Sequence, residues 1–285
     1  MSSRTSMGLT DWHSHIWEAE HLGPEFGPQL DMHYTHVPSH SGTPEAHRAA
    51  MERAGVEECI VIGLVSDHLG VRVPNDYVAS YVSTWNGRAV GVASVDPNRA
   101  SACDDLREAH ELGLRGVKLA PPYQNFHPHS RDAYAVYETA TSLGMFIIFH
   151  QGGVSHRRGV LEVAQPVLLD RVARDFPDTT IIVAHMGQPW HNEVVTLLRK
   201  HPRVIADLSA RCARTNQLRR ILKDANDYGL LPKLVWGSDF PTFDPKVHAE
   251  QLLEAAETSG GELPTPAELE LLLSRPLSAV PGIVQ

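Results

Sequence analysis

The chain has 285 residues, of which 42% are hydrophobic, and its formal net charge is -9. This length suits one large domain or two ordinary ones. The acidic balance, without any Lys/Arg-rich run, argues against nucleic-acid binding. Three cysteines lie far apart, at Cys59, Cys103 and Cys212, which excludes a thiolate zinc site and argues against a disulfide framework. The first ten residues lack a signal-like apolar stretch, and no run approaches the ~20 apolar residues that cross a bilayer. We therefore expect a cytoplasmic protein without a membrane partner.

Short apolar runs alternate with stretches of helical spacing along the chain. The apolar runs predict strands at residues 8–13, 57–64, 88–95, 115–119, 145–150, 179–185, 203–207 and 233–238. The stretches between them predict helices at residues 44–54, 75–85, 101–112, 131–143, 160–176, 188–200, 215–228 and 245–258. Eight strands, each followed by a helix, indicate a (β/α)8 TIM barrel, an α/β fold. We find no linker, and expect residues 1–285 to form one domain.

Three segments depart from this alternation. Residues 16–41 are rich in His, Gly and Pro and lack periodicity, which is typical of a functional rim loop, a lid or substrate wall, or of a mobile surface loop. Residues 120–130 follow the fourth strand and belong to the same rim. Residues 259–285 should form a short helix, at about 266–273, and a tail packed on the outside.

A His-x-His pair, His13 and His15, ends the first predicted strand. Residues i and i+2 of a strand point to the same face, so both rings could reach one ion. The pair alone is weak evidence, because such a pattern often arises by coincidence on a surface. Asp11 shares this face but lies deeper, where we expect a buried carboxylate that supports its neighbours through hydrogen bonds.

Three further polar residues, His150, His185 and Asp239, each close an apolar run. Any one of them could be a hydrogen-bonded residue at the edge of the core. Parallel strands of a closed barrel, however, bring their C-terminal ends to one rim, so residues distant in sequence can surround one ion. Three imidazoles, a carboxylate and a further His are the groups that a catalytic zinc-type site requires.

Five segments together resemble a known family: residues 11–15 (Asp-Trp-His-Ser-His), 116–128 (Gly-Val-Lys-Leu-Ala-Pro-Pro-Tyr-Gln-Asn-Phe-His-Pro), 149–150 (Phe-His), 184–187 (Ala-His-Met-Gly) and 237–241 (Gly-Ser-Asp-Phe-Pro). They resemble the amidohydrolase-related family (amidohydrolase 2), in the metal-dependent TIM-barrel branch that includes aminocarboxymuconate semialdehyde decarboxylase. The sequence departs from the family pattern at Ala120, where a His is common, at His191, where an acidic residue is common, and in the tail, which lacks an Asn-Ala pair.

The resemblance implies one divalent metal, usually Zn2+, held by His13, His15, His150 and Asp239. It also implies that His185 is the catalytic histidine, while Asp239 could bind metal, accept a proton, or do both. This assignment suits the chemistry of the residues, because a divalent ion activates water near neutral pH and an imidazole can carry the proton.

Four residues near the rim are candidates for substrate binding. Lys118 stands where binuclear relatives carry a carbamylated lysine, but the branch resembled is mononuclear, so binding of a substrate carboxylate or a structural hydrogen bond is favoured. Arg211 could hold an anionic substrate or form a surface ion pair. The aromatic side chains of Trp17 and Tyr123 suggest a flat ring or a conjugated acid, or ordinary lid packing.

Two enzymatic functions and one non-enzymatic function fit these residues. The leading hypothesis is a metal-dependent hydrolase of an amide, ester or lactone of a small, carboxylated or cyclic metabolite. The alternative is a non-oxidative decarboxylase of an aromatic or unsaturated acid, which the branch also includes. A barrel that only binds a ligand is the third. We expect a small-molecule substrate and leave a homodimer open.

Overall fold

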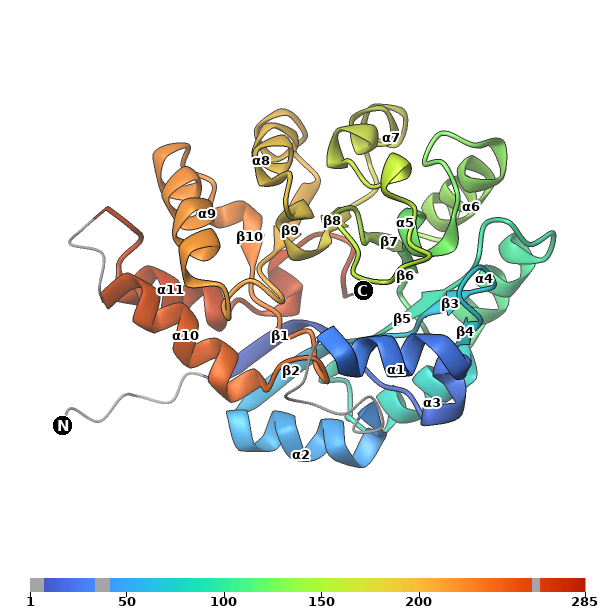
Figure 1. Cartoon of the computed structure of the whole chain (residues 1–285), viewed down its shortest axis with the longest axis horizontal. Helices are drawn as coiled ribbons and strands as arrows, with labels where there is room; N and C mark the ends of the chain where they lie inside the picture. The colour runs from blue at the N-terminus through green and yellow to red at the C-terminus, as the bar shows by residue number, and fades with distance from the viewer. Residues whose placement is uncertain (1–7, 34–41, 258–261, 285) are drawn as a thin grey trace.

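The computed structural model describes residues 8–33, 42–257 and 262–284. Within these residues, eight parallel strands form one sheet with helices arranged around it, which confirms the predicted TIM barrel (Figure 1). In sheet order the strands are β1 (Leu9–His15), β2 (Val56–Ile62), β5 (Ala89–Ser94), β6 (Gly116–Leu119), β7 (Phe146–Phe149), β8 (Ile181–Val183), β9 (Val204–Asp207) and β10 (Leu234–Val235). All eight overlap the predicted apolar runs.

The barrel closes between β10 and β1. Three backbone hydrogen bonds join the two edges, from Trp12 N to Trp236 O, from Asp239 N to His13 O and from His15 N to Phe240 O, at 2.7–2.9 Å. The residues after β10 thus continue along β1 to the rim of the barrel. This seam places Asp239 directly beside the His-x-His pair.

Helices follow the strands as the helical spacing predicts. They are α1 (Gly23–His33), α2 (Pro44–Ala54), α3 (Asn75–Ser83), α4 (Ala102–Glu111), α5 (Pro121–Gln124), α6 (Arg131–Ser142), α7 (Leu169–Asp175), α8 (His191–Lys200), α9 (Thr215–Asp227), α10 (Pro245–Glu257) and α11 (Pro266–Leu273). Helix α2 shows how the local sequence determines where a helix begins and ends. Thr43 caps its first turn by accepting from Ala46 N, Pro44 is the first helical residue, and Gly55 ends the helix in the left-handed conformation.

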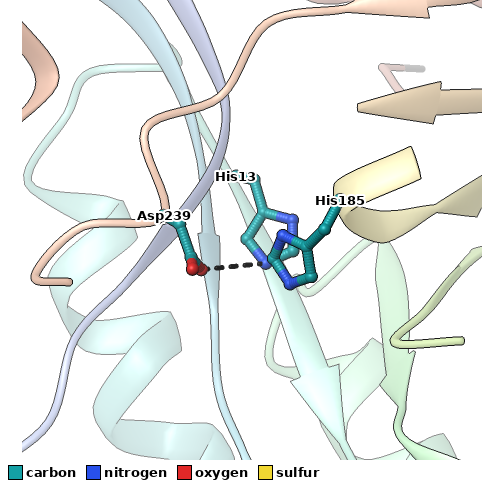
Figure 2. Close-up of side chains that lie close together, drawn as sticks. All are labelled: His13, His185 and Asp239. Atoms are coloured by element: carbon teal, nitrogen blue, oxygen red, sulfur yellow. Dashed lines mark ion pairs between the residues drawn. The ribbon is translucent and has the colours of Figure 1, made fainter. Parts of the chain in front are cut away.

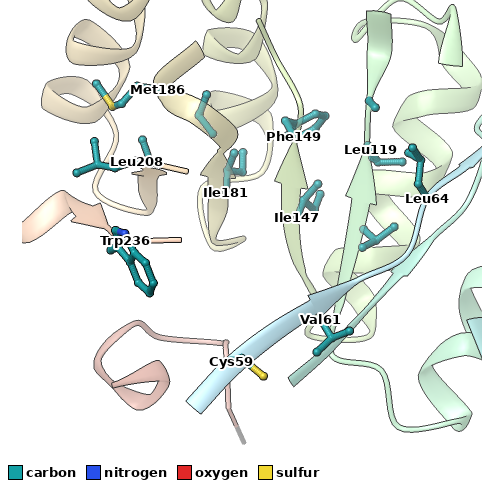
Figure 3. Packing of buried hydrophobic residues seen from close by; sticks show 14 of the residues in the cluster. Cys59, Val61, Leu64, Leu119, Ile147, Phe149, Ile181, Met186, Leu208 and Trp236 are labelled. Atoms are coloured by element: carbon teal, nitrogen blue, oxygen red, sulfur yellow. The ribbon is translucent and has the colours of Figure 1, made fainter. Parts of the chain in front are cut away.

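In the strands other than β1, alternate residues pack into two separate layers. On β2, Cys59 and Val61 face the surrounding helices, and part of this outer layer is shown in Figure 3. Ile60 and Ile62 belong instead to a second cluster that fills the barrel. Both faces of these parallel strands are therefore buried, which explains why they read as continuous apolar runs.

Residues 16–41 contain more regular structure than predicted. A 3-10 helix (Ala19–Leu22) and α1 occupy part of the segment, while residues 34–41 lie outside the described residues. Two glycines and two prolines in α1 hide its helical pattern, and packing decides the outcome: buried Phe26 lies edge-on to Tyr123 and is stacked on His156. The role of this segment as a lid or substrate wall stays a prediction.

Other deviations from the predicted elements have local causes. The helix predicted at residues 160–176 begins only at Leu169, after two 3-10 turns, because Pro166 cannot donate a backbone hydrogen bond. A short antiparallel hairpin, β3 (Val65–Ser66) with β4 (Val71–Arg72), follows β2 and was not predicted. That residues 1–285 form one domain stays a prediction.

The tail after α11 does not pack on the outside, contrary to the prediction. Leu277, Val280 and Ile283 are buried in the cluster that fills the barrel, and Trp12 Nε1 donates to Arg275 O at 3.0 Å. The prolines of the tail made its apolar pattern hard to recognise in the sequence. Its apolar side chains cover the end of the barrel opposite the rim of His13 and Asp239.

No helix within the described part of the chain is long and apolar enough to cross a membrane.

Candidate active site

A bulge in β1 turns both histidines of the His-x-His pair into the barrel. The pairing with β2 shifts between Asp11 and Ser14, so that one extra residue of β1 opposes the same stretch of β2. Trp12 and His13 therefore both lie inside, although adjacent residues of a regular strand face opposite ways. Ser14 faces outwards, where its hydroxyl contacts His47 Nε2 at 2.9 Å.

Donor atoms from β1 and from the segment after β10 converge at the barrel mouth. His13 Nε2 lies 3.2 Å from His15 Nε2, and Asp239 Oδ1 lies 3.7 Å and 3.6 Å from these two nitrogens. One ring nitrogen each of His13 and His185 and a carboxylate oxygen of Asp239 also lie within 4.8 Å of one another (Figure 2). Thus three of the four predicted metal ligands lie close together, beside the predicted catalytic histidine, His185.

The backbone at two of these residues adopts an uncommon conformation. His185 has a φ of 55° and Asp239 a φ of 63°, in the left-handed region that residues other than glycine rarely occupy. Such conformations persist where the surrounding structure enforces them, and they cluster at functional sites. Here the Asp239 amide is held by the carbonyl of His13, and the His185 amide by the Asp207 carboxylate.

Hydrogen-bond partners define which ring nitrogens carry hydrogen. His13 Nδ1 faces Asp207 Oδ2 at 2.8 Å, and His15 Nδ1 faces the Ile62 carbonyl at 3.1 Å. Both partners only accept, so each Nδ1 carries the hydrogen and each Nε2 presents a lone pair. Two lone pairs and a carboxylate oxygen that face one another are electron-pair donors of the kind that bind a divalent cation. The donor set therefore fits a divalent metal.

Burial sets the charge of these groups. It lowers the pKa of His13, His15 and His185 well below the ordinary value, which keeps the rings in the neutral form that binds metals. It also lowers the pKa of Lys118 to about 8 and raises the pKa of Asp239 to about 7, although their opposite charges counteract both shifts. Lys118 Nζ contacts His13 Nε2 at 3.1 Å, so a cationic side chain reaches the donor set directly.

A cavity of about 110 Å³ opens over this cluster. All four predicted substrate-binding residues line it: the cations Lys118 and Arg211, which are 3% and 8% exposed, and the aromatic residues Trp17 and Tyr123. Arg211 donates to Gln217 Oε1 at 3.2 Å. Phe26 of α1 adds a third ring, which was not predicted.

His150 lines the same cavity but takes a more peripheral position. Its ring centroid lies 5.0 Å from that of His185 and 4.8 Å from that of Tyr123. Its Nε2 lies 3.4 Å from the Gly153 carbonyl oxygen, and burial lowers its pKa to about 3. Its role as a metal ligand stays a prediction.

Two buried carboxylates, of Asp11 and Asp207, accept hydrogen bonds from residues of the cluster. Asp11 Oδ1 accepts from the amides of His13 and Ser238, at 3.0 Å and 2.9 Å, and so ties β1 to the segment after β10. This agrees with the supporting role expected for Asp11. The second carboxylate, Asp207, was missed, although it closes the apolar run of β9 as His150 closes that of β7.

The barrel and its polar rim define a class of protein, a TIM barrel with a metal-type donor set at the C-terminal strand ends. The chain belongs to the amidohydrolase family, which matches residues 10–275. This confirms the family that the sequence motifs indicated. No curated protein matches the chain.

Solved structures with the same fold include enzymes of two reaction types. An uncharacterised TIM-barrel protein, Bb4693 of Bordetella bronchiseptica, is 22% identical, with a TM-score of 0.78 over 95% of this chain and 99% of that one. A probable 2-pyrone-4,6-dicarboxylic acid hydrolase of Acinetobacter baumannii, with citric acid bound, is 15% identical (TM-score 0.61, 87% and 91% covered). A variant of 5-carboxyvanillate decarboxylase of Novosphingobium aromaticivorans, with bound manganese, is 13% identical (TM-score 0.65, 95% and 96% covered).

Proposed function

We propose that the protein is a metal-dependent hydrolase that acts on an amide, ester or lactone of a small, carboxylated or cyclic metabolite. The observation that carries this proposal is the set of acceptor atoms of His13, His15 and Asp239, all within 3.7 Å of one another and beside His185 in one cavity. Membership of the amidohydrolase family supports the reaction class.

His13, His15 and Asp239 would hold the metal, with His150 as a further ligand from β7. A divalent ion held there would supply a Lewis acid, which is the chemistry that activation of a carbonyl group requires. Zn2+ is our first choice because neutral imidazoles and a carboxylate suit it. Manganese is the second, because the decarboxylase of Novosphingobium aromaticivorans holds it.

His185 would transfer the proton. Its Nδ1 is engaged by the Ser209 hydroxyl at 2.7 Å, so its other ring nitrogen, Nε2, carries a lone pair. Burial keeps the ring neutral, the form that can take a proton. The ring also lines the cavity, which places it within reach of a bound substrate.

Lys118 and Arg211 would bind a carboxylate of the substrate. Both are buried cations on the cavity wall, and a carboxylate in a site of low polarity interacts strongly with such cations. The rings of Trp17, Phe26 and Tyr123 would pack against the body of the substrate and exclude water. This wall includes part of the segment 16–41, which we propose acts as a substrate wall.

Decarboxylation of an aromatic acid is the second candidate. The combination of two buried cations with three aromatic rings in one cavity favours a planar, carboxylated substrate, and such a substrate would serve either reaction. The third hypothesis, a barrel that only binds a ligand, predicts that the purified protein binds an aromatic acid without converting it.

The deciding experiment is to incubate protein loaded with Zn2+ or Mn2+ with a panel of lactones, esters, amides and aromatic acids. Hydrolysis should incorporate oxygen from isotopically labelled water into the product. Release of CO2 without such incorporation would refute the hydrolase and support the decarboxylase. His13→Ala should abolish turnover by loss of metal, measured by elemental analysis, and Phe243→Leu, outside the lining of the cavity, serves as a control. A cytoplasmic location is a further part of the proposal.

A further inference from the structure

One carboxylate, that of Asp207 at the end of β9, reaches two histidines of the site. Its Oδ2 lies 2.8 Å from His13 Nδ1. Its Oδ1 accepts from the His185 amide at 2.9 Å and from the Ser209 amide at 3.1 Å. The same oxygen accepts a short hydrogen bond from the Ser209 hydroxyl. The Asp207 side chain is completely buried, so no water competes for these bonds.

The contact between Asp207 Oδ2 and His13 Nδ1, which we call the first branch, determines which ring nitrogen of His13 carries hydrogen. Because a carboxylate only accepts, His13 must carry its hydrogen on Nδ1. Its Nε2 therefore presents a lone pair towards His15 Nε2 and Asp239 Oδ1. The opposite tautomer would place a hydrogen in the middle of this donor set, where it would block a metal ion.

The second branch runs from Asp207 Oδ1 through the Ser209 hydroxyl to His185 Nδ1, and it determines which ring nitrogen of His185 carries hydrogen. The Ser209 hydroxyl donates to Asp207, so its oxygen accepts from His185 Nδ1 at 2.7 Å. The Ser209 carbonyl lies at 3.3 Å from the same nitrogen. Both contacts keep the hydrogen on Nδ1 and leave the other nitrogen of His185 free of hydrogen.

We propose that Asp207 is a positioning residue that sets the tautomers of His13 and His185 together, so that one ring can bind the metal and the other can accept a proton. The two branches leave from different oxygens and can therefore be separated by substitution. This inference rests on the proposed function for its catalytic meaning, but its tautomers and its metal affinity can be measured without any substrate.

Asp207→Asn tests the first branch selectively. Oδ1 accepts three hydrogen bonds, so the asparagine oxygen should keep that place and its amino group should face His13 Nδ1. An amino group donates, so His13 would have to move its hydrogen to Nε2. Asp207→Asn keeps the number of hydrogen bonds, so the fold should persist. His13 Nε2, however, would carry hydrogen and could no longer bind a metal. Ser209→Ala instead removes the hydroxyl that links Asp207 Oδ1 to His185 Nδ1, and it leaves Asp207 Oδ2 beside His13 Nδ1.

Nitrogen-15 NMR of the imidazole rings in metal-free protein reports the tautomers directly. We expect hydrogen on Nδ1 of both rings in the wild type and on Nε2 of His13 in Asp207→Asn. Affinity for Zn2+ alone, measured by competition with a chelator, should fall about 10- to 100-fold in Asp207→Asn. It should change by less than about threefold in Ser209→Ala, whose kcat should fall without a matching rise in KM.

Asp11→Asn is the matched control. Asp11 is an equally buried carboxylate at the same rim, but its Oδ1 accepts from the amides of His13 and Ser238 and from no ring. Its substitution should leave both tautomers unchanged. Hydrogen on Nδ1 of His13 in Asp207→Asn, with unchanged Zn2+ affinity, would overturn the proposal. Loss of Zn2+ affinity in Ser209→Ala would overturn the separation of the branches. Failure of every substrate would count against the proposed function and leave these results intact.

Discussion

Replacement of Gly237 by alanine should disturb the site through the backbone alone. A Cβ at this position would lie 2.7 Å from His13 Cβ and 2.8 Å from His13 N. Ordinary contacts of a Cβ begin near 3.4 Å, so β1 and the segment after β10 would have to separate by roughly 0.7 Å, which exceeds the ~0.5 Å tolerance of a preorganised site. The neighbouring atoms belong to the main chain and to Cβ of His13, and no side-chain rotation can relieve the clash.

We expect Gly237→Ala to destabilise the fold by about 1–3 kcal/mol, as overpacking of a core does, and to weaken metal binding at least about tenfold, because the separation falls between His13 and Asp239. Urea denaturation gives the first quantity and titration with Zn2+ the second. Gly63→Ala is the control, since its Cβ would meet Val78 Cγ2 at 3.4 Å and nothing closer. A Gly237→Ala protein with wild-type stability and Zn2+ affinity would refute this reasoning.

Three further substitutions test the tail, an ion pair and the proposed general base. Ile283→Ala, which empties a fully buried position in the barrel, should cost about 2–4 kcal/mol in urea denaturation, whereas the 39% exposed neighbour Val284 should tolerate alanine; equal effects would contradict the burial of the tail. Hydrogen bonding to Lys200 lowers the pKa of Asp170 to about 2, so this carboxylate stabilises the fold above its unfolded pKa near 4 and loses that contribution as the pH falls towards 2. Asp170→Asn should therefore cost about 1 kcal/mol at neutral pH and progressively less as the pH falls from ~4 towards ~2, and a cost that does not shrink over this range would rule out the ion pair as its source. His185→Ala should keep the metal, by elemental analysis, and lose most of the turnover; an apo protein would show that His185 is a ligand.

The sequence predicted those parts of the fold and site that depend on strand ends. His150, His185 and Asp239 each close an apolar run, and the barrel topology alone brings such positions to one rim. Local signals were equally reliable where they act within a few residues, as with the Thr43 cap and Gly55 at the ends of α2. These features are encoded by neighbours in the chain, so they can be read without the tertiary structure.

What could not be predicted depends on contacts between distant segments. Helix α1 exists because Phe26 packs on Tyr123 and His156, against a local sequence rich in Gly and Pro. Ile283 is drawn into the barrel by partners far away in the sequence. The bulge in β1 arises from its register with β2, and no periodicity of β1 reveals it. Tertiary packing overrode the local preference in each case.

The seam of the barrel and the candidate site are the same structure. The His13 carbonyl and the His15 amide close β1 onto the segment after β10, and their side chains are two of the proposed ligands. Asp239 stands on the other side of that seam and supplies the third. A metal bound by these three would therefore join the first and the last strand, in addition to the three backbone hydrogen bonds that already do so. Because binding to the folded state alone shifts the folding equilibrium, closure of the barrel and assembly of the donor set must be coupled: whatever separates β1 from β10 removes the site, and whatever fills the site holds the two strands together.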